Sequence, residues 1–162
     1  MKIGVYPGTF DPVTHGHTDI VTRGLRIFEK VIVAVAPNPS KHPLFNLQER
    51  LDMVRLVTED IPNVEVTIFD GLLVDFVRRR GAHAILRGLR AISDFEHEFQ
   101  MALVNRKLAE SVETVFLMPS EEYSYLSSTI IKDVATHGGS LKDFLHPVVA
   151  QHLHERIRGL KA

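Results

Sequence analysis

The chain has 162 residues, enough for one domain with a full core, and 44% of them are hydrophobic while 24% are charged. Its formal net charge of −1 gives no reason to expect nucleic acid or an anionic membrane as a partner. It has no cysteine, which excludes disulfides, thiolate metal sites and cysteine nucleophiles and fits a cytoplasmic location. The longest apolar run, residues 31–36, is too short to span a membrane, and no signal-peptide-like apolar region precedes Pro7.

The first residues predict a strand, a glycine-bearing loop and a helix. Residues 3–5 form an apolar run suited to a buried strand, residues 7–12 are rich in turn formers, and an amphipathic pattern starts at Thr18. Phosphate binds at such a place in α/β proteins, because backbone N–H groups and the positive end of the helix dipole face one point.

Three residues of this loop are candidates for contact with an anion. Gly8 and Gly16 would let the backbone approach a ligand without a Cβ in the way. His17 could donate a hydrogen bond or a positive charge to the same anion. An ordinary turn and a surface or capping histidine are the alternatives, since short motifs often match by chance.

The rest of the chain alternates strand and helix patterns. Further strands are predicted at residues 31–36, 64–68, 84–86 and 115–118. Helices are predicted at residues 18–28, 47–57 and 73–77, from a cap at Ser93 to about residue 108, at residues 127–137, and from 141 onward with a break at Pro147. This alternation predicts an α/β fold in which residues 1–162 form a single domain. We expect a Rossmann-like, doubly wound, five-stranded parallel sheet with helices on both faces.

Local signals mark several helix ends and one buried face. Asn46 with Glu49, and Ser93 with Glu96, have the spacing of capping boxes. Gly81 can close the short helix that ends in the basic run of residues 78–80. In the helix that follows Ser93 and ends near residue 108, the spacing predicts that four apolar side chains point inward: Phe95, Phe99, Ala102 and Leu103.

Ligands bind at the carboxyl ends of the strands in such sheets, so the loops that leave the predicted strands should form one site. Lys41 follows a proline-rich loop and suits a phosphate, although a solvated lysine is the commoner case. Arg87 and Arg90 flank Gly88 at a strand end and together suit polyphosphate, although each alone resembles a surface salt-bridge residue. The hydroxyls of residues 127–129 form an N-cap cluster that could also cradle phosphate.

Two carboxylates and the histidines leave alternatives open. Glu98 could be exposed, hold ribose hydroxyls or hold an arginine, and Asp11 could form a turn or associate with a metal. His15 and His17 lack the accompanying ligands of a zinc site. No G-x-S-x-G motif supports a serine-hydrolase triad.

The sequence resembles the phosphopantetheine adenylyltransferase family of the nucleotidylyltransferase superfamily. The superfamily signature is matched by Thr14-x-Gly16-His17. The resemblance to the family covers nearly the whole chain and is carried by the segments Tyr6–Pro12, Pro39–Lys41, Arg87–Arg90, Asp94–Glu96 with Glu98, Phe116–Ser120, and Tyr123–Thr129 before Lys132. The ordered combination of these later segments is more specific than the signature alone.

The resemblance implies adenylyl transfer from ATP to 4′-phosphopantetheine, which gives dephospho-coenzyme A and pyrophosphate, with Mg²⁺ as cofactor and a homohexamer as the assembly. It implies catalytic roles for His17, Lys41 and Arg90. It implies that ATP is bound by Thr9, Phe10, His17, Gly88, Leu89, Arg90, Glu98, Tyr123, Ser124, Tyr125, Leu126, Ser127, Ser128 and Thr129, and phosphopantetheine by Thr9, Lys41, Leu73 and Arg87.

The chain departs mildly from the family pattern. His15 stands where Asn is common, His97 where an aromatic residue is common, and Leu126 and Thr129 replace the usual Ile and Ser. Two other functions stay open on sequence alone. One is adenylyl transfer to another acceptor such as nicotinate mononucleotide, and the other is a non-catalytic nucleotide-binding domain on the same fold.

Overall fold

Five parallel strands form one sheet in the order β3-β2-β1-β4-β5 in the computed structural model, which describes residues 1–90 and 95–161. The strands are β1 (Ile3–Gly8), β2 (Lys30–Val35), β3 (Val64–Ile68), β4 (Ala84–Gly88) and β5 (Glu113–Leu117). The chain runs outward from β1 to β3 and then crosses to β4 on the other side of β1. The predicted doubly wound, five-stranded parallel sheet is therefore confirmed, and its order reverses beside β1.

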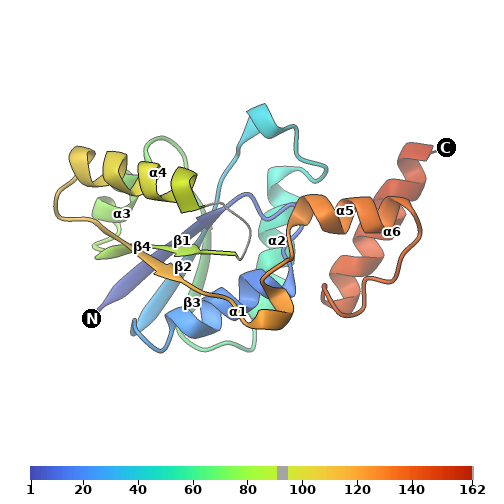
Figure 1. The fold of residues 1–162 in the computed structure, drawn as a ribbon, viewed down its shortest axis with the longest axis horizontal. Coiled ribbons are helices and arrows are strands. Elements are labelled where there is room, and N and C mark those ends of the chain that lie inside the picture. Colours follow the sequence, from blue (N-terminus) through green and yellow to red (C-terminus); the bar gives the residue numbers. More distant parts are fainter. Residues whose placement is uncertain (91–94, 162) are drawn as a thin grey trace.

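Helices cover both faces of the sheet, and two further helices lie beyond the strands (Figure 1). They are α1 (His15–Gly24), α2 (Leu47–Thr58), α3 (Leu73–Arg79), α4 (Phe95–Leu108), α5 (Ser128–Thr136) and α6 (Pro147–Lys161), with short 3-10 turns η1 (Pro39–Lys41) and η2 (Glu121–Tyr123). Figure 1 shows α3 and α4 on one side of the sheet, and the α5–α6 pair beyond the strands. Among the described residues, no helix combines the length and the apolar character that crossing a bilayer requires.

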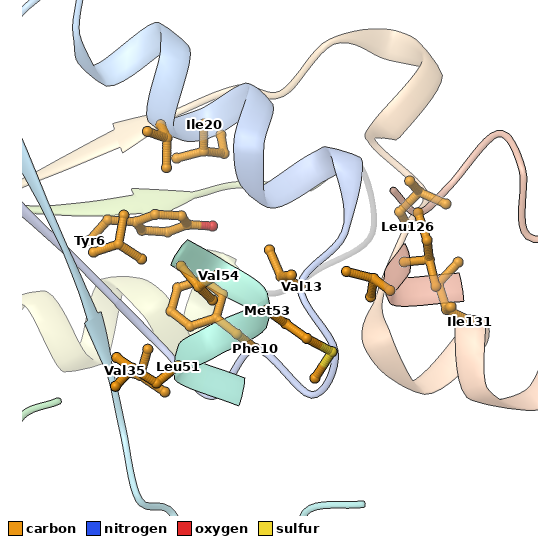
Figure 2. Close-up of a cluster of buried hydrophobic side chains, with 14 of the residues drawn as sticks. Tyr6, Phe10, Val13, Ile20, Val35, Leu51, Met53, Val54, Leu126 and Ile131 are labelled. Carbon is orange, nitrogen blue, oxygen red and sulfur yellow. The ribbon is translucent and has the colours of Figure 1, made fainter. Parts of the chain in front are cut away.

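The alternation of side chains along each strand builds two separate cores. Val31, Val33 and Val35 of β2 belong to the larger cluster, which includes residues of α1, α2, α5 and α6. Ile32 and Ala34 point the other way, into a smaller cluster with residues of α3. Figure 2 shows part of the larger cluster. A strand buried on both faces explains why the β2 sequence is apolar at every position of its centre.

Side-chain caps define the helix ends, and one of them corrects a predicted boundary. The Asn46 side chain accepts a hydrogen bond from the Glu49 N–H at 2.9 Å and the reciprocal bond is also present, which confirms this capping box. The prediction that α1 begins at Thr18 was wrong, because Thr14 is the N-cap and His17 is the third residue of the helix. The capping box expected at Ser93 lies outside the described residues.

The prediction of an inward-facing apolar stripe on α4 was largely wrong. About half of the side chain is exposed at each of Phe95, Phe99 and Leu103, and Glu98 is the helix's buried residue. Further large apolar side chains of this helix are exposed as well: Met101, Val104 and Leu108. Apolar residues lie around most of α4, so one face of the sheet cannot cover them all.

Candidate active site

A cavity of about 800 Å³ opens at the carboxyl ends of β1 and β4, where the strand order reverses. Loops from five separate parts of the chain form its walls. They bring together most of the residues that the sequence singled out: Thr9, Phe10, His17, Lys41, Leu73, Arg87, Gly88, Arg90, Glu98, Tyr123, Leu126, Ser127, Ser128 and Thr129. The expected convergence of these loops into one site is therefore observed.

Three of the predicted ATP-binding residues are not among those that line this cavity. The Leu89 N–H donates to the Leu117 carbonyl at 2.9 Å, which continues the sheet past β4. Ser124 bonds the Glu121 carbonyl within its own turn. The half-exposed ring of Tyr125 packs edge-on against Phe144.

The first turn of α1 holds the His17 imidazole in one orientation. The backbone N–H of Thr14 donates to His17 Nδ1 at 2.9 Å, and the His17 N–H donates back to the Thr14 hydroxyl at 3.4 Å. The Phe10 ring packs edge-on against the imidazole, with the ring centroids 5.0 Å apart. Because Nδ1 accepts a hydrogen bond, the hydrogen of the neutral ring sits on Nε2, which can donate to a ligand.

His17 is uncharged at neutral pH. Burial, followed by repulsion from Arg90 and Arg87, lowers its pKa from 6.5 to about 4. Of the two possibilities that the sequence left open, a hydrogen bond from His17 fits this environment and a donated charge does not. The positive charge at this site is supplied by arginine and lysine side chains instead.

Arg87 is oriented by Glu98 across the gap between β4 and α4. Its Nε and Nη2 donate to the two carboxylate oxygens of Glu98 at 2.7 and 2.5 Å, and Nη1 donates to the Pro7 carbonyl at 3.0 Å. A bidentate pair of this kind fixes the plane of the guanidinium. Of the roles considered for Glu98, holding an arginine is the one that the structure shows.

The loop after β2 carries Lys41 to the cavity. Lys41 ends the turn η1 and is exposed, while Asn38 and His42 on either side of the turn have left-handed backbone angles. The Asn38 side chain donates to the Thr9 hydroxyl at 2.8 Å. This contact ties the loops that follow β1 and β2 to each other at the cavity wall.

The N-terminus of α5 forms another wall. The Ser127 hydroxyl caps the helix by accepting from the Ile130 N–H at 3.1 Å, and the Ser128 hydroxyl donates to the Pro12 carbonyl at 2.9 Å. The predicted N-cap role of the hydroxyl cluster at residues 127–129 is therefore confirmed for Ser127. The same bonds fix the helix end, with its exposed N–H groups and positive dipole, against the loop after β1.

Asp11 is a buried connecting residue. Its carboxylate accepts from the N–H groups of Leu44 and Phe45, both at 2.9 Å, and forms an ion pair with the Lys132 ammonium at 2.9 Å. Asp11 therefore joins the loop after β1 to the segment before α2 and to α5. Sequence reasoning assigned no role to Lys132, although it lines the cavity and adds a cation there.

Arg50 was missed completely by sequence reasoning. Its side chain is 1% exposed and donates to the main-chain carbonyls of four residues: Thr9, Ala36, Pro37 and Phe45. Burial lowers its pKa, an effect that nearby Asp11 opposes. A signal was present, because Arg50 falls on the apolar stripe of α2 between Leu47 and Val54.

Of the two glycines of the first loop, Gly8 is required by the packing of a neighbouring side chain and Gly16 is not. A Cβ on Gly8 would lie 2.8 Å from the Phe10 ring, which is itself packed against Tyr6 and His17. A Cβ on Gly16 would meet Tyr123 at an ordinary contact distance. Both glycines line the cavity, so the prediction that they let the backbone approach a ligand stays a prediction, and at Gly8 the packing of Phe10 is a second reason for glycine.

The described residues hold no group of three or more histidine, cysteine or acidic side chains arranged to bind a metal ion. Asp11 and Glu98, the two carboxylates of the cavity, are already engaged by Lys132 and Arg87. Of the alternatives left open for Asp11, the metal ligand is thus disfavoured by its own contacts.

The sequence matches a family model and named relatives over much of its length. The family model described as cytidylyltransferase-like matches residues 5–134. Two relatives named phosphopantetheine adenylyltransferase, from Caldanaerobacter subterraneus subsp. tengcongensis and Alkalilimnicola ehrlichii, are 56% and 58% identical to the chain. The matches cover 98% and 97% of this chain and 99% and 91% of those proteins.

Solved structures share the fold at low sequence identity. A Vibrio parahaemolyticus structure assigned as a nicotinate-nucleotide adenylyltransferase has a TM-score of 0.71 at 17% identity, over 97% of this chain and 95% of that one. A bifunctional NMN adenylyltransferase/ADP ribose pyrophosphatase from Francisella tularensis has a TM-score of 0.70 at 16% identity, over 95% of this chain and 49% of that one.

We expect the His17 imidazole to titrate with a midpoint near pH 4, well below 6.5, when followed by NMR. Because the folded pKa is lower than the unfolded one, neutral His17 adds stability that is complete above pH 6.5 and is lost as the pH falls toward 4. In the Arg90→Ala variant, which removes one source of repulsion, the midpoint should rise. A midpoint of 6.5 or higher in the unaltered protein would contradict the buried, neutral assignment.

Proposed function

The chain belongs to the cytidylyltransferase-like family and, within it, to the phosphopantetheine adenylyltransferases, and we propose that it transfers the adenylyl group of ATP to 4′-phosphopantetheine. The products are dephospho-coenzyme A and pyrophosphate, and the reaction is reversible. The observation that carries the proposal is the single cavity in which His17, Lys41, Arg87 and Arg90 meet. Two negatively charged reactants need such a concentration of cations and donors to meet end to end.

The two substrates take different walls of the cavity in this proposal. ATP lies against the segments 88–90 and 123–129, which follow β4 and β5 and include the N-terminus of α5. Phosphopantetheine lies against Lys41, Leu73 and Arg87, and Thr9 stands where the two meet. Glu98 contributes by fixing Arg87, and Lys132 adds a further cation for the polyphosphate.

The chemistry requires no general base on the protein. The attacking group is the phosphate of phosphopantetheine, which is already an anion, so the protein has only to align it in line with the α-phosphate of ATP. His17 donates from Nε2 to the charge that develops on the α-phosphate, and Lys41 and Arg90 offset the charge of the flanking groups. The bond from the acceptor oxygen to the α-phosphorus forms as the bond to pyrophosphate breaks, and no covalent protein intermediate arises.

Mg²⁺ accompanies the reaction as the cation of the ATP phosphates in this proposal. The engaged carboxylates Asp11 and Glu98 make a dedicated protein cage for it a poor fit. When bound, the ion neutralises phosphate charge and supports the departure of pyrophosphate.

A second hollow supports the placement of the acceptor. It has a volume of about 170 Å³ and shares Leu73, Arg87, His97 and Glu98 with the main cavity. The remainder of its lining comes from α4, β4 and β5 and includes Met101, Ala102, Asn105 and Thr114. A mixed lining of this kind suits an amide-bearing, partly apolar chain such as the pantetheine arm.

The enzyme works in the cytoplasm and as a homohexamer in this proposal. The lack of cysteine fits a reducing compartment, in which ATP is abundant. The apolar residues exposed on α4 support self-association, because a helix that is apolar on most sides needs a covering surface.

Release of pyrophosphate from ATP in the presence of each acceptor tests the reaction directly. We expect turnover with phosphopantetheine and dephospho-coenzyme A as the product. Turnover with nicotinate mononucleotide and none with phosphopantetheine would favour the rival acceptor. Binding of ATP without turnover of any acceptor would favour a regulatory nucleotide-binding domain.

His17→Ala should lower kcat by about two to four orders of magnitude while ATP affinity changes little, because the His17 contact strengthens in the transition state. Steady-state kinetics and calorimetric titration with ATP measure the two effects. The control is His152→Ala, an exposed position on α6, and it should keep kcat within about twofold. A large loss of ATP affinity with unchanged kcat would refute this role.

Lys41→Ala should weaken phosphopantetheine more than ATP, by roughly tenfold or more, since Lys41 supplies the charge on the acceptor side. Calorimetric titration with each ligand separates the two affinities. Lys142→Ala, which removes an exposed lysine elsewhere, should change neither. Equal losses for both ligands would count against the assignment of Lys41 to the acceptor.

Light scattering should give six times the chain mass of 18.3 kDa if the hexamer is correct. Phe99→Glu places a charge on the exposed apolar surface of α4 and should reduce the assembly to smaller species. Gln100→Glu adds the same charge at the next, also exposed, position and should leave the mass unchanged. A monomeric unaltered protein would remove the hexamer from the proposal.

A further inference from the structure

Arg50 lies where the backbone hydrogen bonds between β1 and β2 end and the loops that follow these two strands begin. The last ladder bond between the β1 and β2 segments runs from the Ala36 N–H to the Gly8 carbonyl at 2.8 Å. The next two carbonyls, those of Thr9 and Ala36, both accept from Arg50 Nη1 at 2.7 Å. One guanidinium nitrogen therefore joins the two loops immediately beyond the point where backbone pairing ends.

The other nitrogens of Arg50 extend the same connection. Nη2 donates to the Pro37 carbonyl at 3.0 Å, and Nε donates to the Phe45 carbonyl at 3.1 Å. The side chain is 1% exposed, so these bonds form in a medium in which charge-assisted hydrogen bonds are strong. Four carbonyls from three parts of the chain are thereby held by one rigid fork, which no other side chain can reproduce.

One of the loops that Arg50 joins leads to Lys41 on the acceptor side, and the other contains Thr9, where the two substrates meet in the proposed function. Thr9 and Lys41 both line the cavity, and Pro37 comes two residues before the turn η1 that ends at Lys41. The loops after β4 and β5, which contain Arg90 and residues 123–129, make none of these contacts with Arg50. In the proposed function the acceptor meets both of the loops that Arg50 joins, whereas ATP meets only one of them, the Thr9 loop. A displacement of the Arg50 contacts should therefore weaken binding of the acceptor more than binding of ATP.

We propose that Arg50 is a positioning residue that fixes the Lys41 loop against the Thr9 loop and so sets the affinity of the enzyme for the acceptor phosphate. The proposal rests on the proposed function, because it assumes that Lys41 and Thr9 receive phosphopantetheine. Arg50 itself lies behind the cavity wall and touches no reactant. It acts by holding main-chain carbonyls in place. A substitution of the Thr9 or Lys41 side chain would leave these main-chain contacts intact.

Arg50→Lys is the main test, because it keeps a positive charge and loses the fork. An ammonium has three hydrogens on one atom and cannot reach four carbonyls that are now served by three nitrogens. We expect the KM for phosphopantetheine to rise by about tenfold or more, while the KM for ATP stays within about twofold. The control is Arg80→Lys, since Arg80 pairs with Glu65 at the start of β3, at the opposite end of the sheet, and both KM values should be unchanged.

The split between the two KM values separates positioning from simple support of the fold. If Arg50 only stabilised the protein, the Lys variant would lose active molecules, and kcat would fall with both KM values unchanged. That result would overturn the proposal, as would a larger loss for ATP than for phosphopantetheine. Unaltered protein that forms no dephospho-coenzyme A would instead overturn the proposed function, and this inference with it.

A second variant keeps the test decisive if Arg50→Lys does not fold. Asn38→Gly removes the bond to the Thr9 hydroxyl, which is another connection between the same two loops. Glycine accepts the left-handed backbone of Asn38, with φ of 44°, so the turn itself should persist. We expect the same selective rise in the KM for phosphopantetheine, by roughly threefold or more. An unchanged KM for phosphopantetheine in this variant would contradict the proposal that contacts between these loops set the affinity for the acceptor.

Discussion

The loop that leaves the central strand β1 is the part on which the cavity depends. Its carbonyl at Thr9 is held by Arg50, its Phe10 ring packs against the imidazole of His17, and its buried Asp11 carboxylate binds two backbone N–H groups and Lys132. Each of these contacts reaches a different part of the chain. Because β1 is the central strand and pairs with β2 and β4, its loop lies between the loops that follow those strands and contacts several of the segments that form the cavity.

The electrostatics of the cavity follow from burial. An imidazole next to two arginines gives up its proton, so His17 acts as a neutral donor while the lasting positive charges come from side chains that stay protonated. This division suits a reaction between two anions. Charge attracts and aligns the reactants, and a fixed donor then meets the atom on which negative charge develops.

Much of the fold could be predicted because its signals are local. The alternation of apolar runs and helical patterns predicted the parallel sheet, and the spacing of Asn46 and Glu49 predicted a cap that the structure confirms. The loops of the cavity could be predicted as a group, since parallel strands share one carboxyl edge. The start of α1 was missed because its first turn is polar, and amphipathic spacing becomes visible only later in the helix.

The contacts that arrange the cavity could not be predicted in the same way. Asp11 and Lys132 are 121 positions apart, and nothing in their local sequence connects them. Arg50 has a visible anomaly, a cation on an apolar stripe, but its four carbonyl partners depend on how the loops fold over it. The exposed apolar side chains of α4 could not be predicted for another reason. The spacing of apolar residues indicates which side chains favour burial, but it does not indicate which surface buries them.

The pairing of Arg87 with Glu98 affects which anions bind the cavity when no substrate occupies it. An arginine in an open cationic hollow attracts the small anions of its surroundings, and an incoming reactant must then displace them. Glu98 serves as a tethered counter-ion that occupies the guanidinium edge without leaving the protein. The cavity is therefore less attractive to inorganic phosphate and chloride than its arginines and lysines alone would make it.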